Sequence, residues 1–288
     1  MDLPSFVPAY VELVDDPENL NVLLMGKNGS NVDTLIFAHV DSEDGQLVLI
    51  SIPRDLYYQN RKINSIYAEK GVLAQVAAVE DVVGYKIQHY ALIDMYVFRD
   101  IVDDLGGVDV TLKEDLIDPT YKTCDGEVCS TLYYAAGFHH LNGTEALRVA
   151  RSRHTTSDYS RAERQQLILQ GIQEKLRTLG VGDTGTLFEL FATVLGALET
   201  DISLPQATQY FLKYQSYELD GGNVISSANV LQAVPVPVDY VTSHPLHWCE
   251  DETKPETCKD GYAIDTLQPQ NHNWDLIRWY VNGVVEGD

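Results

Sequence analysis

The run NVLLMGKNGSNVDTLIFAHVDSEDGQLVLISIPRD, residues 21–55, decides the fold. It holds three β-rich segments, at 21–26, 34–40 and 46–52, and the turn signal DSEDG separates the last two. Pro53 ends the third strand because its ring removes a backbone donor and restricts the residue before it. Residues 27–31 are predicted to form a polar turn, so Asp33 follows a loop and Arg54-Asp55 sits at a strand end.

Helical and extended segments alternate along the rest of the chain. The spacing of apolar residues predicts strands at 89–94 and 108–112, an extended stretch at 223–240 with Pro235 and Pro237 at a sheet edge, and helices at 73–83, 96–105, 143–150, 160–179, 187–198, 204–214 and 274–281. Ser160 and Glu163 have the form of a capping box, and Asn282-Gly283 is expected to stop the last helix. The alternation predicts an α/β fold with helices packed on a mixed sheet. We expect one domain, residues 20–288, after an irregular segment at 1–19.

Acidic residues dominate the chain, with 43 Asp and Glu against 20 Lys and Arg and a formal net charge of −23. This balance argues against a nucleic-acid partner, which needs basic groups to displace phosphate counterions. It is otherwise typical of a solvated surface. No run approaches 18 uninterrupted apolar residues, and the start of the chain lacks the features of a signal peptide. The chain as given is expected to be soluble, or to be a fragment whose anchor has been cut away.

Four cysteines form two close couples in polar, loop-like segments, Cys124/Cys129 and Cys249/Cys258. Neither couple has the CxxC spacing of a zinc or thioredoxin-like site. His244 and His247 lie near Cys249, so a metal site there stays open, although no recognised spacing supports it. We favour two local disulfides that staple the loops near 124–129 and 249–258, which implies an oxidising compartment. The alternative is four unrelated thiols in a cytosolic protein.

Five arginines cluster within 17 residues of this acidic chain, at Arg148, Arg151, Arg153, Arg161 and Arg164. If residues 150–154 are extended, Arg151 and Arg153 project on one face about 7 Å apart. Two guanidinium groups at that separation suit a diphosphate, because each can bind phosphate oxygens with two hydrogen bonds.

The long helix that follows adds to this anion site. Arg161 and Gln165 are four residues apart and share a face of it. A helix N-terminus also offers free N–H groups and a partial positive charge, and Asp158 lies on the loop before it. The alternative is a surface helix whose arginines pair with the abundant carboxylates.

Three further residues are candidates for an anion or metal site. Arg54, at a strand end, and Lys62 are cationic, although Arg54 beside Asp55 is by itself more often a local salt bridge. Asp33 suits Mg²⁺, which prefers carboxylate and phosphate oxygens. A single loop aspartate is more often a turn former.

Eight blocks of the sequence, in order, resemble the LytR-CpsA-Psr domain between about residues 20 and 180. They are NVLLMG (21–26), DT (33–34), LISIPRD (49–55), KIN (62–64), LGGVDV (105–110), LNG (141–143), ARSR (150–153) and DYSRAERQQ (158–166). The segment WDLIR (274–278) also resembles the end of the family's domain.

This resemblance implies a three-layer α/β/α sandwich with a central mixed β-sheet and an apolar channel, between sheet and helices, for polyprenyl chains. It implies a transferase that moves a glycopolymer from a polyprenyl-pyrophosphate carrier to a cell-wall acceptor, usually with Mg²⁺, and pyrophosphatase activity beside it. The expected location is extracytoplasmic, at the cell envelope. There the enzyme would meet the membrane surface through its lipid carrier, with an N-terminal transmembrane anchor that this chain lacks.

The resemblance also assigns roles by position. The pyrophosphate would be held by Arg54, Lys62, Arg151, Arg153, Arg161 and Gln165. The catalytic residues would be Arg54, Arg151, Arg153 and Asp158. The metal would be held by Asp33 and Asn28. The chemistry is phosphoryl transfer to an acceptor hydroxyl, which depends on positioning and on neutralisation of charge.

The sequence departs from the family in the loop before Asp33, and this departure bears on whether the chain is an enzyme or only binds lipid. The loop before Asp33 is short, and Asn28 and Asn31 stand where the family usually has an additional Asp and an Arg. A neutral amide oxygen should weaken Mg²⁺ binding or leave the ion to the substrate phosphates. The alternative function is therefore a non-catalytic module that binds polyprenyl-phosphate lipids in the cell envelope. An acidic adhesion domain is a third hypothesis, and it predicts no lipid binding.

Overall fold

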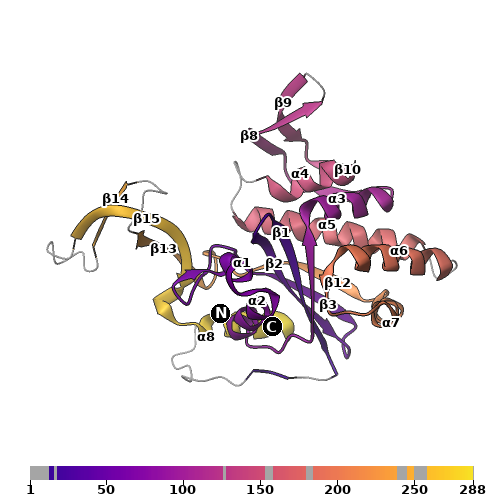
Figure 1. Cartoon of the computed structure of the whole chain (residues 1–288), viewed down its shortest axis with the longest axis horizontal. Coiled ribbons are helices and arrows are strands. Elements are labelled where there is room, and N and C mark those ends of the chain that lie inside the picture. Colours follow the sequence, from indigo (N-terminus) through magenta and orange to yellow (C-terminus); the bar gives the residue numbers. More distant parts are fainter. Residues whose placement is uncertain are drawn as a thin grey trace.

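A computed structural model of the chain describes residues 13–15, 18–125, 128–152, 158–179, 184–238, 245–249 and 258–287. At its centre is a six-stranded sheet in the order β11-β6-β1-β2-β3-β12 (Figure 1). The strands are β1 (Leu20–Asn28), β2 (Asn31–Asp41), β3 (Gln46–Ser51), β6 (His89–Asp94), β11 (Glu199–Thr200) and β12 (Glu218–Val224). β6 is parallel to β1 and β12 to β3, while the other neighbours are antiparallel. The sheet is therefore mixed, as predicted.

The turn between β1 and β2 is tighter than predicted. Only Gly29 and Ser30 lie between the two strands, and Gly29 adopts a φ of 66° that favours glycine. The register shifts after Gly26, which pairs with Thr34, whereas Lys27 pairs with Val32. Asp33 follows the turn, as expected, but it is the extra residue of a β-bulge inside β2, which was not predicted. Bulges bend a strand and redirect its side chains, often beside functional sites.

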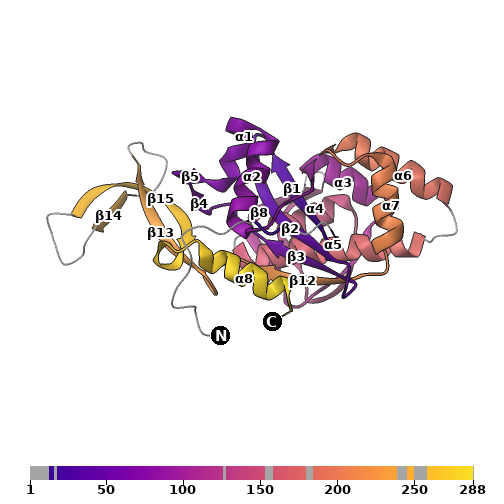
Figure 2. The same cartoon turned by 90° about the horizontal axis from the view of Figure 1, so that it is seen from below.

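Helices pack on both faces of this sheet (Figures 1 and 2). On one face, Leu23, Phe37 and Ile50 are buried with residues of α2 and α8. On the other, Ile36, Ala38 and Leu49 pack against Leu169 of α5. The helices are α1 (Ile66–Lys70), α2 (Val72–Val83), α3 (Met95–Asp104), α4 (Gly143–Arg151), α5 (Asp158–Leu179), α6 (Thr184–Ala197), α7 (Leu204–Tyr214) and α8 (Asp275–Val285). None of the helices in the described ranges is long and apolar enough to cross a membrane.

A second core holds α4 beside α3 and α5. It is formed by buried residues that include Val102, Val108, Leu141, Val149 and Ile168, and it includes the two-stranded sheet of β7 (Val108–Leu112) and β10 (Gly137–Leu141). Gly143 allows α4 to approach α3 closely, because a Cβ atom there would overlap the carbonyl oxygen of Arg99. This packing fixes the ends of α4 and α5, which carry the clustered arginines.

Several helix boundaries differ from the predictions, and three of these differences concern predicted caps or the clustered arginines. α4 begins at a capping box of Asn142 and Glu145 and continues to Arg151, so the extended conformation predicted for residues 150–154 is wrong at Arg151. α5 begins at Asp158, which places Ser160 inside its first turn and not at a cap. α8 continues past Asn282-Gly283 to Val285. At the end of α4, donors from Arg164 and Gln165 of α5 bind the carbonyl groups of Val149, Ala150 and Ser152, which local sequence could not show.

Further strands form small sheets beside the core. They are β4 (Tyr57–Tyr58) with β5 (Arg61–Lys62), β8 (Leu116–Asp125) with β9 (Val128–Tyr134), and β13 (Leu231–Val238), β15 (Cys258–Pro269) and β14 (Pro245–Cys249) in that order. The β13-β15-β14 sheet extends away from the body in both views (Figures 1 and 2). Pro235 and Pro237 lie on its edge strand β13, as expected.

Some predicted features fall outside the described residues. Most of the segment 1–19 does, and so does His244. The metal site considered near Cys249 therefore stays a prediction.

Each cysteine couple spans two paired antiparallel strands. Cys124 pairs in register with Cys129 across β8 and β9, and Cys249 with Cys258 across β14 and β15. Residues directly opposite in antiparallel strands have Cα atoms about 4.5–5.5 Å apart, within the range of about 4.4–6.8 Å that disulfides span. The backbone thus suits the two local pairings and disfavours the cross-pairings.

We predict that peptide mapping by mass spectrometry, without reduction, will recover Cys124 linked to Cys129 and Cys249 linked to Cys258 in protein purified from an oxidising compartment. The opposed register of the strands is the reason. Peptides that link one couple to the other, or alkylation of all four thiols before reduction, would contradict this prediction.

Candidate functional site

A pocket of about 530 Å³ lies between the central sheet and helices α3 to α6. Strands β1, β2 and β6 form one wall, and the helices form the others. Most of the lining is apolar and includes Leu24, Ile36, Ile93, Phe98, Ile168 and Ile172. Such a lining favours an apolar ligand.

The remaining lining residues make one part of the pocket strongly cationic. Four cations and one carboxylate line it together with neutral polar residues, namely Lys27, Arg54, Arg151, Arg161, Asp33, Asn28, Thr34 and Gln165. They come from the end of β1, the start of β2, the segment after β3, the end of α4 and the start of α5. In a chain with a formal net charge of −23, this is a local reversal of sign that attracts an anion.

Helix α5 shows how the pocket changes along its length. Arg161 and Gln165 line it from the first two turns, and Ile168, Leu169 and Ile172 follow on the same face. From Arg161 to Ile172 the helix rises roughly 16 Å. The charged part and the apolar part are therefore continuous, which suits a ligand with an anionic head and an apolar tail.

Arg54 is held at the pocket by two aspartates. Its Nη1 atom lies 2.5 Å from Asp33 Oδ1, and its Nε lies 3.6 Å from Asp55 Oδ2. Lys62 does not line the pocket, and its Nζ binds Asp55 Oδ1 at 2.7 Å. Arg54 thus lines the pocket and also forms the local salt bridge with Asp55. Lys62 contacts Asp55 and not the pocket, so it acts on the site indirectly.

Lys27 and Arg151 differ from Arg54 because neither forms an ion pair with any residue in the described ranges. Arg151 is the last residue of α4 and is partly buried at the pocket. Lys27, which lies in β1 opposite the β2 bulge, was not predicted from the sequence to belong to the site. Only the long-range pairing of β1 with its neighbours could have shown its position. Unpaired cations that line a pocket favour a bound anion.

Arg164 has a structural role, although it belongs to the same cluster. Its Nε donates to the carbonyl oxygen of Val149 at 3.1 Å and its Nη2 to that of Ser152 at 2.7 Å. Gln165 Nε2 donates to the carbonyl oxygen of Ala150 at 3.3 Å. Burial lowers the pKa of Arg164, and the nearby carboxylates, first among them Glu114, act in the opposite direction. Together these donors satisfy carbonyl groups at the end of α4 that no helical N–H can reach.

A buried carboxylate fixes the residue that follows Arg151. Asp118 is 2% exposed and accepts a hydrogen bond from Ser152 Oγ at 2.8 Å. Its other oxygen accepts from the backbone N–H of Tyr121 at 3.0 Å. The hydrogen bond from the buried Ser152 attaches the end of α4 to β8. The donors of Arg164 and Gln165 attach it to α5.

Two predicted site residues fall outside what the structure describes. Arg153 lies in the undescribed range 153–157, and of Asp158 only the backbone, the first residue of α5, is described. Arg161, by contrast, is buried, with 7% exposed, and lines the pocket. Six of the predicted phosphate- and metal-binding residues therefore line this pocket, namely Arg54, Arg151, Arg161, Gln165, Asp33 and Asn28.

The oxygen ligands near Asn28 fit a Mg²⁺ site poorly. Asp33 is the single described carboxylate that lines the pocket, and its Oδ1 binds Arg54. Asn28 adds one neutral oxygen. In the described residues no group of three or more His, Cys, Asp or Glu is arranged to hold a metal ion. Mg²⁺ prefers about six oxygen ligands and usually one or two carboxylates free to bind it, so this set does not form a metal site by itself.

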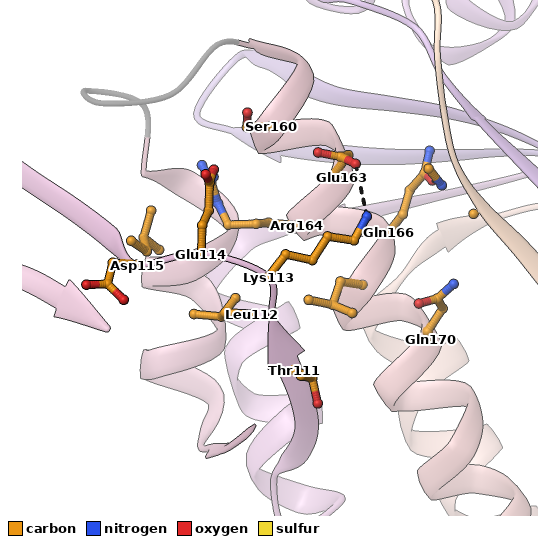
Figure 3. A pocket seen from close by; sticks show the side chains of 14 residues that line it. Thr111, Leu112, Lys113, Glu114, Asp115, Ser160, Glu163, Arg164, Gln166 and Gln170 are labelled. Carbon is orange, nitrogen blue, oxygen red and sulfur yellow. Dashed lines mark hydrogen bonds and ion pairs between the residues drawn. The ribbon is translucent and has the colours of Figure 1, made fainter. Parts of the chain in front are cut away.

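A second pocket, of about 540 Å³, is lined by the opposite face of α5 (Figure 3). Its cations already face carboxylates: Lys113 Nζ lies 3.5 Å from Glu163 Oε1, and Glu114 lies beside Arg164 (Figure 3). Asp115 adds a further negative charge. The acidic residues outnumber the cations here, so this pocket disfavours an anion and the pocket at Arg151 is the better candidate.

The fold and the site define a class of protein: an α/β protein whose pocket joins a cationic end to an apolar body between sheet and helices. A family model, the LytR_cpsA_psr family, matches residues 7–232. The chain belongs to the LytR-CpsA-Psr family, and the resemblance noted in the sequence is confirmed.

Two curated relatives carry names that state an activity. A polyisoprenyl-teichoic acid–peptidoglycan teichoic acid transferase, TagU of Bacillus anthracis, is 34% identical over 177 residues, which cover 57% of this chain and 55% of the relative. TagV of Bacillus subtilis, of the same printed activity, is 30% identical over 161 residues, which cover 52% of this chain and 40% of the relative. The chain thus spans about half the length of these relatives.

Solved structures show the same fold. The crystal structure of Bacillus subtilis TagV covers 94% of this chain and 98% of its own at a TM-score of 0.67 and 21% identity. A structure described as TagT bound to LIIa-WTA covers 94% of this chain and 91% of its own, at a TM-score of 0.63 and 20% identity. The arrangement of mixed sheet and helices is therefore that of these proteins.

The contacts predict opposite effects on stability for two neighbouring arginines. Arg164→Met leaves buried carbonyl groups without donors and should lower the free energy of unfolding by about 2–3 kcal/mol. Arg151→Met removes no ion pair within the described residues and should change it by less than about 0.5 kcal/mol. Urea denaturation of both variants measures the difference. Equal losses would show that Arg151 has a structural role too.

Proposed function

We propose that this chain transfers a glycopolymer from a polyprenyl-pyrophosphate carrier to a hydroxyl group of a cell-wall polymer, as an extracytoplasmic enzyme at the cell envelope. Membership of the LytR-CpsA-Psr family supports this, together with the printed names of the relatives. The observation that carries the proposal is the pocket in which Arg54, Arg151 and Arg161 lie at one end of an apolar cavity.

The two parts of the pocket match the two parts of the proposed carrier. The pyrophosphate binds at the cationic end, where arginines can each donate two hydrogen bonds to phosphate oxygens. The polyprenyl chain lies along Leu24, Ile36 and Ile168, in the apolar channel expected for the family. Burial of its carbons contributes about 0.8 kcal/mol per CH₂ group, so the tail supplies much of the affinity and the arginines position the phosphates.

The proposed reaction is a phosphoryl transfer. The acceptor oxygen attacks the phosphorus that carries the glycopolymer and forms a new P–O bond, while the bond to the bridging oxygen breaks. Polyprenyl phosphate leaves, and the hydroxyl proton is released. Arg54, Arg151 and Arg161 neutralise the charge on the phosphates during this step, with Arg153 as a further cation. Asp158, at the start of α5, is the carboxylate that we propose accepts the proton.

A second candidate function is favoured by Asn28 and by the contact of Asp33. If the metal is required for turnover, a pocket whose carboxylate is paired with Arg54 would bind the lipid without cleaving it. The chain would then be a lipid-binding module of the cell envelope, with the same ligand and no product.

A transfer assay separates the two functions. The protein is incubated with a short polyprenyl pyrophosphate-linked oligosaccharide and peptidoglycan, with and without Mg²⁺, and polyprenyl phosphate and acceptor-linked sugar are measured. We predict turnover by the wild type and a loss of about 100-fold or more in Arg151→Ala, because a charge-stabilising donor is removed. Lys113→Ala, which removes a cation of the second pocket in the segment after β7, is the matched control and should keep its rate.

The other outcomes decide between the alternatives. Tight binding of the lipid without release of polyprenyl phosphate, under both metal conditions, would establish the lipid-binding module. The absence of lipid binding would refute both functions. Equal rates in Arg151→Ala and the wild type would move the reaction away from this pocket.

A further inference from the structure

We infer that Lys27 binds the pyrophosphate in place of a divalent metal ion, so that this chain holds its anionic ligand without Mg²⁺. This inference rests on the proposed function, since it concerns the same pocket and ligand. It adds a binding residue and removes a metal requirement.

The position of Lys27 is set by the bulge in β2, opposite the end of β1. Lys27 pairs with Val32 across the shifted register, and Asp33 is the extra residue beside it. Both residues line the pocket, together with Arg54 and Arg151. Lys27 therefore contributes to the cationic end from the sheet side, and its Nζ lies next to Tyr67 of α1, which does not itself line the pocket.

The contacts of Lys27 leave its charge unneutralised. Its Nζ lies 3.5 Å from Tyr67 Oη and 5.6 Å from the centre of the Tyr67 ring, and both groups are neutral. Tyr67 Oη in turn donates to Glu199 Oε2 at 2.8 Å. Asp94, which pairs with Lys27 in the register of β1 and β6, accepts a hydrogen bond from the backbone N–H of Tyr96 at 2.9 Å. The carboxylates of Glu199 and Asp94 are thus engaged with other donors, and no carboxylate of the described residues forms an ion pair with Lys27.

A divalent metal ion would face unfavourable surroundings in the same place. Among the described residues, four cations and one carboxylate line this pocket, and Oδ1 of that carboxylate, Asp33, is 2.5 Å from Arg54 Nη1. A second carboxylate beside it would help to attract Mg²⁺, but residue 28 is a neutral asparagine. Like charges repel, so a metal ion would have to displace Arg54 and approach Lys27 at the same time.

The charge balance of the ligand fits the residues alone. In a pyrophosphate esterified at both ends, each phosphate carries one negative charge. Lys27 and Arg151, the two cations without an ion pair in the described residues, supply two positive charges, and Arg54 and Arg161 add donors. A metal ion is therefore not needed to neutralise the bound pyrophosphate.

Isothermal titration with a geranyl pyrophosphate diester, whose second phosphate carries N-acetylglucosamine, tests the inference directly. We expect the wild type to bind with dissociation constants within about threefold of each other in EDTA and in Mg²⁺. Lys27→Ala should weaken binding in EDTA by about tenfold or more, which corresponds to about 1.4 kcal/mol, while Lys27→Arg should retain most of the affinity. Lys113→Ala, which removes an equal charge elsewhere, should change the affinity by less than about twofold.

Asn28→Asp provides a gain-of-function control. The added carboxylate should weaken binding in EDTA, and Mg²⁺ should restore it, so that a metal dependence absent from the wild type is created. Wild-type binding that is lost in EDTA would overturn the inference and leave the proposed function intact. Unchanged affinity in Lys27→Ala would overturn the role of Lys27. Failure to bind in either condition would refute the proposed function as well.

Discussion

The rotation of α5 about its own axis is the constraint on which the site depends, and Gln166 fixes it. This side chain is 1% exposed, and its Nε2 donates to Ser51 Oγ at 2.8 Å and to the carbonyl oxygen of Asn223 at 3.0 Å. Its Oε1 accepts from the backbone N–H of Gly222. With Gln166 held against the sheet, Arg161 and Gln165 must face the apolar pocket and Arg164 must face the end of α4. One buried amide thus divides the cluster into binding and structural residues.

The same division explains how an acidic chain keeps a cationic pocket. Arg164 and Arg54 have partners, so they contribute to stability. Lys27 and Arg151 have no ion pair in the described part of the chain, and their charges repel those of the neighbouring cations. Such local conflict between charge and stability is common at functional sites, where a ligand relieves it. The pocket is therefore organised for an anion before one binds.

Much of the fold followed from local sequence patterns. The strands at 46–52 and 89–94 and the helices α2 and α7 depend on nearby residues and are close to the predictions. The predicted conformation at the end of α4 was wrong because that end depends on donors from α5, which are remote in sequence. The bulge at Asp33 was likewise invisible, since it depends on the pairing of β1 with β2.

The site was predicted in its residue types more than in its geometry. Arg54, Arg151 and Arg161 do meet at one pocket, yet Arg151 does so from a helix end and not from an extended strand. Lys62 supports the site through Asp55, one step further away than expected. Lys27 was missed because a lysine next to a turn has no local signal of function.

A crystal structure of the protein with geranyl pyrophosphate tests the central claim most directly. The account predicts the diphosphate against Lys27, Arg151 and Arg161, with the geranyl chain along Leu24 and Ile168. A diphosphate bound in the pocket at Lys113, or a geranyl chain that lies outside the cavity between sheet and helices, would contradict it.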